Sequence, residues 1–299
     1  MRIMLTGANG QVGWELARSL MPLGEVVALN RTQCDLSRPE TIPGIVQEIK
    51  PDLIVNAAAY TAVDKAEEEE VLATTINGTA VGVLAEQAKR RNALLVHYST
   101  DYVFDGTKST PYTEEDEPNP INAYGRSKLA GEQAVREVGG EHLIFRTSWV
   151  YAVRGSNFIK TILRLASERD ELKVIADQLG APTSAEFIAD ITALCLYRQV
   201  HGNVFAEEMV GTYHLAPTGE TSWHGLAEYV IAEAQHYGFK LRTASENVCP
   251  VSSTEYQLPA QRPVNSQLVT QKLADVLGVR LPVWQDSVDR MLSEMLAGK

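Results

Sequence analysis

A tyrosine and a lysine stand one helical turn apart in Tyr124-Gly-Arg-Ser-Lys128, about two dozen residues after Ser99-Thr100-Asp101. A free tyrosine has a pKa near ~10, which is too high for ready proton exchange at neutral pH. An ammonium group beside it favours the phenolate, so we expect Lys128 to lower the pKa of Tyr124. Such a phenol suits the interconversion of a carbonyl and an alcohol, with Thr100 or Ser99 hydrogen-bonding the same oxygen.

A glycine-rich turn near the N-terminus is the second element that this chemistry needs. The apolar run Arg2–Thr6 precedes Gly7-Ala-Asn-Gly10-Gln-Val-Gly13, and an apolar stripe of helical period follows. Strand, glycine turn and helix form the context of a dinucleotide-binding fingerprint, although the spacing here is G-x-x-G-x-x-G. Gly7 permits the tight turn, Gly10 lets the backbone approach a pyrophosphate, and Gly13 lets helix and strand pack closely. The phosphates would lie on the helix N-terminus.

Strand and helix patterns alternate through the first half of the chain. Strands are predicted at residues 2–6, 25–29, 52–56, 94–99 and 142–147, and near 212–215. A long helical pattern begins near Val63 and continues past Ala88. The alternation predicts an α/β protein with a doubly wound parallel sheet of the Rossmann type.

Length, charge and cysteine content limit the class of protein. The 299 residues can form one large domain or two unequal ones. No apolar run approaches the ~18 residues of a membrane span, so we expect no membrane partner. The net charge of −11 argues against broad nucleic-acid binding. Cys34, Cys195 and Cys249 lack disulfide or metal spacing, which favours a cytoplasmic protein.

The combination of motifs resembles the extended short-chain dehydrogenase/reductase superfamily. Within it, five stretches are similar to the dTDP-4-dehydrorhamnose reductase family: Gly10-Gln-Val-Gly-Trp-Glu15, Asn56-Ala-Ala-Ala-Tyr-Thr-Ala-Val-Asp64, Ser99-Thr-Asp-Tyr-Val-Phe-Asp-Gly106, Arg146-Thr-Ser-Trp-Val-Tyr151 and Arg262-Pro-Val-Asn-Ser266. The resemblance covers essentially the whole chain. It implies a dinucleotide-binding domain of residues 1–150 plus part of 184–216. A smaller, discontinuous C-terminal substrate domain would comprise residues 151–183 and 217–299.

This resemblance also implies an activity and its residues. NAD(P)H would reduce the C4 ketone of dTDP-4-dehydro-β-L-rhamnose, a dTDP-sugar, in a homodimeric enzyme. Tyr124 would protonate the oxygen, Lys128 would hold the nicotinamide ribose, and Thr100 would hydrogen-bond the oxygen. The implied cofactor-binding residues are Gly7, Gly10, Gln11, Val12, Gly13, Asn30, Arg31, Asp35, Leu36, Ala58, Ala59, Tyr60, Thr61, Tyr98, Tyr124 and Lys128. The implied substrate-binding residues are Thr100, Asp101, Trp149, Asn157, Gln178 and Arg262, with Arg262 favoured for the diphosphate.

The end of the second predicted strand bears on the choice of cofactor. An acidic residue there would bind the adenosine ribose hydroxyls of NAD, whereas a nearby arginine can take the 2′-phosphate of NADP. This chain has Asn30 where many relatives carry an acid, and Arg31 follows it. The pair favours NADPH over NADH; an exposed arginine unrelated to the cofactor is the alternative.

Other activities of the superfamily remain to be weighed. Related 4,6-dehydratases carry a glutamate acid/base where this chain has Tyr102, which argues against water elimination. An epimerase, or a reductase acting on a related nucleotide-deoxysugar, stays open. A third alternative is a non-catalytic, NADP-binding subunit like the regulatory subunit of methionine adenosyltransferase.

A metal site is the last implication of the resemblance. Some members of the family bind magnesium through glutamates at a dimer interface. Glu15, Glu186 and Glu294 lie in similar stretches, but their spacing is not a recognisable metal motif. Solvated helix surfaces are the favoured interpretation of these three residues.

Overall fold

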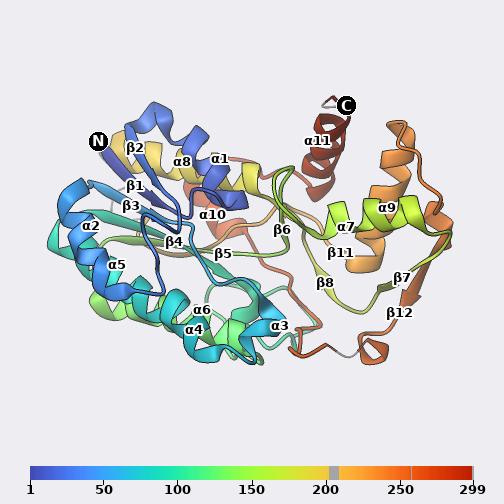
Figure 1. The fold of residues 1–299 in the computed structure, drawn as a ribbon, viewed down its shortest axis with the longest axis horizontal. Coiled ribbons are helices and arrows are strands. Elements are labelled where there is room, and N and C mark those ends of the chain that lie inside the picture. The colour runs from blue at the N-terminus through green and yellow to red at the C-terminus, as the bar shows by residue number, and fades with distance from the viewer. Residues whose placement is uncertain (202–208, 257, 298–299) are drawn as a thin grey trace.

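A six-stranded parallel sheet forms the larger part of the protein, at the left of Figure 1. The computed structural model describes residues 1–201, 209–256 and 258–297. The strands lie in the order β2-β1-β3-β4-β5-β10. Their bounds are β1 (Arg2–Thr6), β2 (Glu25–Leu29), β3 (Leu53–Asn56), β4 (Leu94–Thr100), β5 (His142–Thr147) and β10 (Gly211–His214). The predicted doubly wound Rossmann-type sheet is confirmed, and its order changes direction at β1 and β3, where such sheets bind ligands.

Helices cover both faces of this sheet, each over its own apolar core. One face packs against α1 (Gln11–Ser19), α8 (Ala185–His201) and α10 (Gln271–Leu277). The other packs against α2 (Ile42–Ile49), α5 (Ala80–Arg90) and α6 (Ala123–Val138). Strands buried on both faces read as nearly continuous apolar runs, as the parallel sheet requires. None of the helices in the described ranges is long and apolar enough to span a membrane.

The long helix predicted from Val63 is interrupted. It consists of α3 (Val63–Ala66), α4 (Glu70–Thr74), a π-helical turn at Thr75–Thr79, and α5. The turn places buried Asn77 so that its Oδ1 accepts from Tyr60 N at 2.9 Å. The Nδ2 of the same residue donates to Tyr60 O at 3.0 Å and to Ser127 Oγ at 2.9 Å. These three hydrogen bonds hold the π turn against Tyr60 and Ser127.

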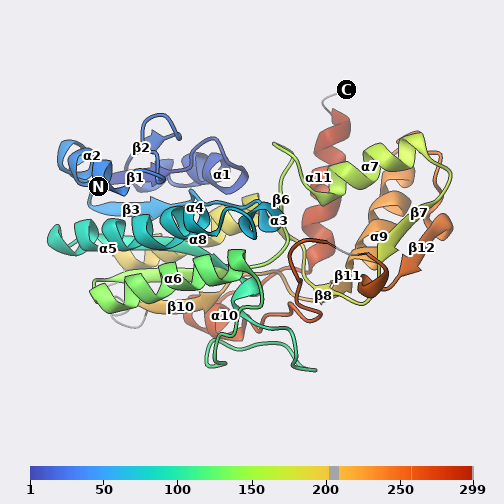
Figure 2. The ribbon, with the colours of Figure 1, turned by 60° about the horizontal axis from the view of Figure 1, so that its bottom comes forward.

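A smaller part, at the right of Figure 1, has a separate core. Its helices are α7 (Phe158–Glu168), α9 (Trp223–His236) and α11 (Trp284–Ala297). The short strands are β6 (Val150–Tyr151), β7 (Leu172–Ile175), β8 (Leu179–Gly180), β9 (Thr183–Ser184), β11 (Thr221–Ser222) and β12 (Val248–Val251). In Figure 2, α11 stands between the sheet and the pair α7 and α9. The carboxyl edge of the sheet thus faces this smaller part.

Residues 260–270, called the C-terminal strap below, connect the two parts. Leu179 N donates to Val264 O at 2.8 Å, and Tyr112 N donates to Gln267 O at 2.8 Å. The Nδ2 of Asn265 donates to Lys108 O and Thr110 O, both at 2.9 Å. The strap therefore bonds β8 of the smaller part and a loop of the larger part at once.

The segment after the strap departs from the predicted division of the chain. We assigned residues 217–299 to the smaller domain, but Leu273, Leu277 and Leu281 belong to the core beneath the sheet. The apolar face of α10 thus packs beside β10, and the division of the chain into two domains stays a prediction.

Candidate active site

A cavity of about 1450 Å³ lies at the carboxyl ends of the sheet strands. Its walls come from the loops after β1, β2, β3 and β4, the first turns of α6, and the loop after β6. Ligand pockets commonly measure ~300–1,000 Å³, so this cavity has room for a dinucleotide and a second ligand together.

Most of the predicted site residues line this one cavity. They are Gly7, Gly10, Gln11, Val12, Arg31, Asp35, Leu36, Ala58, Ala59, Tyr60, Thr61, Tyr98, Thr100, Asp101, Tyr124, Lys128 and Trp149. Five predicted cofactor- or substrate-binding residues lie outside its lining: Gly13, Asn30, Asn157, Gln178 and Arg262.

The glycine turn has the geometry that a phosphate-binding loop needs. Gly7 has a φ of +72°, and a Cβ on it would lie 2.6 Å from Ala58 N. A Cβ on Gly13 would lie 2.1 Å from Gly7 O, so α1 packs against the turn where no side chain fits. Gly10 is the N-cap of α1 and supplies no side-chain cap. The first N–H groups of the helix are therefore available to an anion, which fits the pyrophosphate of a dinucleotide.

Asn30 shapes the turn after β2 instead of facing the cavity. Its Oδ1 accepts from Thr32 N at 2.9 Å and from Thr32 Oγ1 at 2.7 Å. This local turn presents Arg31 to the cavity, with 76% of its side chain exposed. The Arg31 Nε lies 3.7 Å from Asp35 Oδ1, so the guanidinium is only loosely held.

Tyr124, Lys128 and Thr100 converge in the cavity. Asn122 caps the N-terminus of α6 by accepting from Gly125 N at 2.7 Å, which starts the helix just before Tyr124. Thr100, at the end of β4, shares a hydrogen bond with the Tyr124 phenol. Buried Lys128 donates from Nζ to Tyr98 O at 2.6 Å. Tyr124 and Lys128 both lie in α6, so the predicted helix over these residues is confirmed.

The prediction that the pKa of Tyr124 is lowered is wrong for the protein alone. Burial and, secondly, the charge of Asp101 raise the pKa of Tyr124, against a smaller lowering by Thr100. Burial also lowers the pKa of Lys128 to about 8, although Glu132 opposes that shift. Desolvation thus outweighs any attraction between the two groups. At neutral pH the phenol keeps its proton and the amine its charge, which suits proton donation to a developing alkoxide.

Asp101 adds a second titratable group to the same wall. Burial raises its pKa to about 6, while hydrogen bonds from Ser266 and Thr100 lower it. Thr100 Oγ1 donates to Asp101 Oδ1 at 2.9 Å. The Tyr102 ring stands edge-on to Tyr124, with centroids 5.9 Å apart. Two phenols, those of Tyr102 and Tyr124, and the carboxylate of Asp101 therefore line this wall.

An aromatic wall closes the side of the cavity nearest the smaller part. Trp149 has a φ of +47°, a strained value for a bulky residue. Its indole stacks on Trp223, with centroids 3.7 Å apart and planes 12° apart. On another side, a Cβ on Gly180 would come within 2.7 Å of the Trp149 ring. The indole is therefore fixed in one orientation, as a rigid surface for a ligand.

Of the other three predicted substrate-binding residues, Asn157 and Arg262 have side-chain partners within the protein. Asn157 caps α7, and its Nδ2 donates to Ala152 O at 2.6 Å and to Gln11 Oε1 at 3.3 Å. Gln178 is buried just before β8. Arg262 forms a two-pronged ion pair with Asp64. Substrate binding by these residues stays a prediction.

Several residues of the lining were not predicted from the sequence, among them Lys65, Arg154, Ser156 and Trp223. Trp223 is one of only four tryptophans, but nothing in its neighbourhood marks it as a partner of Trp149. Arg154 and Ser156 follow the Arg146–Tyr151 motif in a loop, where binding residues are disproportionately found.

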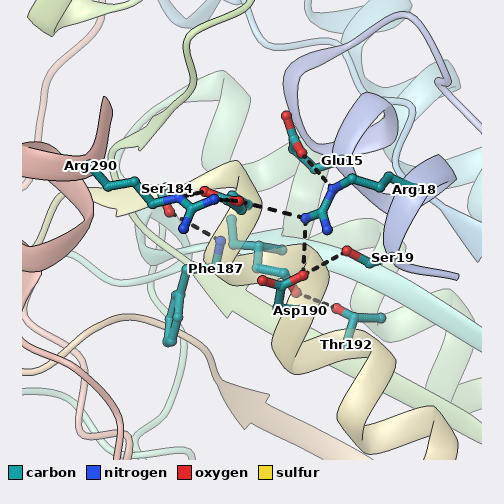
Figure 3. Close-up of polar contacts among 10 residues, drawn as sticks. Glu15, Arg18, Ser19, Ser184, Phe187, Asp190, Thr192 and Arg290 are labelled. Carbon is teal, nitrogen blue, oxygen red and sulfur yellow. Dashed lines mark hydrogen bonds and ion pairs between the residues drawn. The ribbon is translucent and has the colours of Figure 1, made fainter. Parts of the chain in front are cut away.

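The three glutamates suggested for magnesium lie near one another beside α1, α8 and α11. Glu186 and Glu294 both raise the pKa of Glu15, after the larger effect of burial. Two arginines pair with two of them: Arg18 lies 3.5 Å from Glu15 (Figure 3) and 3.8 Å from Glu186, and Arg290 lies 2.7 Å from Glu186. Within the described ranges, no three His, Cys, Asp or Glu side chains form a group that could hold a metal ion. One copy of the chain thus forms an ion-pair network here.

Comparisons with known proteins agree with this geometry. The family model described as the RmlD substrate binding domain matches residues 1–297. A dTDP-4-dehydrorhamnose reductase of Burkholderia thailandensis is 52% identical over 297 residues, covering 99% of this chain and 100% of that protein. The protein of the same name from Escherichia coli K12 is 48% identical over 299 residues, covering 99% and 98%.

Solved structures give the same result. A dTDP-4-dehydrorhamnose reductase of Bacillus anthracis, in complex with NADP, aligns with a TM-score of 0.86 at 36% identity, covering 98% of this chain and 99% of that one. The UDP-glucose 4-epimerase of Thermus thermophilus, in complex with NAD, has a TM-score of 0.80 over the full length of both chains. At 19% identity, the epimerase shares the fold alone. By sequence, family model and structure, the chain belongs to the dTDP-4-dehydrorhamnose reductase family.

Proposed function

We propose that this protein reduces the C4 ketone of dTDP-4-dehydro-β-L-rhamnose to give dTDP-L-rhamnose, with NADPH as the reductant. The observation that carries the proposal is the meeting of a protonated Tyr124, Thr100 and Lys128 in the cavity that also contains the glycine turn. The names of the full-length relatives support the choice of substrate.

The roles of the residues follow from their chemistry. Bound NADPH supplies the hydride. Tyr124 donates its proton to the sugar oxygen, and Thr100 hydrogen-bonds that oxygen. The ammonium of Lys128, one helical turn away, stabilises the phenolate that remains. Trp149 supplies a fixed apolar surface, and the carboxylate of Asp101 can accept a hydrogen bond from a sugar hydroxyl.

NADPH is preferred to NADH in this proposal because Arg31 lines the cavity and no acid occupies position 30. The guanidinium is exposed and only loosely paired, so it is free to bind a 2′-phosphate. The NADP bound to the Bacillus anthracis relative supports the same choice.

The proposal extends to the setting of the reaction. The protein would act in the cytoplasm as a homodimer, and its product would be a sugar donor for cell-surface polysaccharide. Free thiols at Cys34, Cys195 and Cys249 suit that compartment. Magnesium would require carboxylates beyond those of one chain, because Arg18 and Arg290 pair with the nearest glutamates.

Absorbance of the reduced nicotinamide tests the proposal directly. The substrate is produced in situ by the preceding epimerase, and NMR identifies the sugar formed. We expect cofactor oxidation that depends on this protein, faster with NADPH than with NADH, and dTDP-L-rhamnose as the product. A different C4 epimer would change the named product. Cofactor binding without turnover would favour the regulatory or epimerase alternatives.

A further inference from the structure

The loop after β6 lies against the glycine turn. Asn157 Nδ2 donates to Gln11 Oε1 at 3.3 Å, and a Cβ on Gly155 would be in contact with Gln11 Cγ at 3.4 Å. Arg154, Gly155 and Ser156 line the same cavity as Gly10 and Gln11. The smaller part of the protein thus contributes a segment to the wall where the pyrophosphate is expected.

Arg154 rests on a surface tryptophan of the phosphate-binding helix. Its guanidinium carbon lies 3.9 Å from the centroid of the Trp14 ring. Trp14 belongs to the first turn of α1, where its N–H donates to Gly10 O at 3.0 Å, and 49% of the residue is exposed. The positive charge therefore lies over a side chain from the first turn of α1, the helix whose first N–H groups have no side-chain cap.

The other cations of the lining have partners. Lys65 lies 2.9 Å from Glu69, Arg31 lies 3.7 Å from Asp35, and Lys128 donates to Tyr98 O. In the part of the chain that the structure describes, no carboxylate lies within ion-pair distance of Arg154. A guanidinium on an exposed aromatic face is weakly held, whereas a guanidinium fork binds phosphate oxygens strongly. Arg154 is thus placed to exchange one partner for the other.

We propose that Arg154 is a cofactor-binding residue that binds the pyrophosphate common to NADPH and NADH. The inference rests on the proposed function, because it requires a nicotinamide dinucleotide in the cavity. It assigns different parts of the cofactor to two arginines. Arg154 serves the pyrophosphate at the N-terminus of α1, and Arg31 serves the adenosine end.

Equilibrium binding of both cofactors tests this division. Titrations of NADPH and NADH, followed by nicotinamide fluorescence, would compare the unaltered protein with Arg154→Gln and Arg31→Gln. We expect Arg154→Gln to raise the Kd of both cofactors by about 10-fold, or ~1.4 kcal/mol. Arg31→Gln should raise the Kd of NADPH alone. Arg164→Gln, an exposed arginine of α7 paired with Glu168 outside the cavity, is the matched control and should leave both Kd values unchanged.

The outcomes that would contradict the inference differ from the one that would contradict the proposed function. Unchanged Kd values in Arg154→Gln would show that the arginine only packs on Trp14. A loss confined to NADPH would assign Arg154 to the 2′-phosphate. Arg154→Lys keeps the charge without the fork, so its Kd values should lie between those of the unaltered protein and of Arg154→Gln. Such intermediate values would exclude misfolding as the cause. If the unaltered protein bound neither cofactor, the proposed function itself would be wrong.

Discussion

Arg262 of the C-terminal strap and Asp64 of α3 form a two-pronged ion pair, with Nη1 3.0 Å from Oδ1 and Nη2 2.8 Å from Oδ2. Asp64 also accepts from Ala260 N at 3.2 Å, so the carboxylate holds both the side chain and the backbone of the strap. The hydrogen bond from Arg262 lowers the pKa of Asp64. The pair lies beside Tyr102, where the strap meets the wall of the candidate active site.

Two variants separate a structural role of Arg262 from a binding role. We expect Asp64→Asn and Arg262→Lys each to lower the free energy of unfolding by up to about 1 kcal/mol, because either change breaks the fork. If Arg262 also binds the diphosphate, only Arg262→Lys should weaken the binding of dTDP. Urea denaturation and calorimetric titration with dTDP measure the two effects. If both variants bound dTDP as tightly as the unaltered protein, Arg262 would serve only to hold the strap.

Replacement of the proton donor should separate catalysis from binding. Tyr124→Phe is expected to lower kcat by ~10²–10⁴-fold, the usual contribution of a general acid. The Kd of NADPH should change little, since the ring remains. Tyr102→Phe is the matched control: its ring is 5.9 Å away, and we expect it to keep most of the activity. Full activity in Tyr124→Phe would show that another group donates the proton.

Lys128 should control the alkaline limb of the pH profile. Its pKa is lowered to about 8, so kcat/KM should fall as the pH rises through that value. Because the folded-state pKa lies below the unfolded one, the neutral amine is favoured by folding. Its stabilising contribution is present above pH 10.5 and is lost as the pH falls through about 8. Lys128→Met should therefore abolish turnover yet increase the stability at neutral pH, by up to ~3 kcal/mol.

The aromatic wall offers a test by a single methyl group. Gly180→Ala would place a Cβ 2.7 Å from Trp149, so the indole must move and the KM for the nucleotide-sugar should rise. The Kd of NADPH should stay constant. Gly44→Ala is the control, because nothing lies within 4 Å of its Cβ in α2, and it should stabilise the protein by about 0.5–1 kcal/mol. An unchanged KM in Gly180→Ala would remove Trp149 from the substrate site.

Local signals in the sequence predicted much of the fold. The strand bounds at residues 2–6, 25–29 and 142–147 agree with the structure, because apolar runs between turns depend on near neighbours alone. The glycine turn and the Tyr124–Lys128 spacing are local in the same sense, and both were found.

Features that depend on distant residues could not be predicted. The π turn satisfies Asn77 through Ser127, which is 50 residues away. Arg262 and Asp64 are 198 residues apart, so the sequence showed a free guanidinium where the structure has an ion pair. The pKa of Tyr124 rises because burial and Asp101 act on it, and both depend on the folded cavity.

The C-terminal strap has a consequence for the order in which the protein is made. The sheet residues from β1 to β5 leave the ribosome long before the strap, which bonds Asn122 at the start of α6 through Gln261 O. N-terminal units generally fold first during synthesis, whereas contacts across long sequence separations form slowly. The sheet from β1 to β5 can therefore collapse early, whereas Asn122 at the start of α6 gains this hydrogen-bond acceptor only after Gln261 has been synthesised.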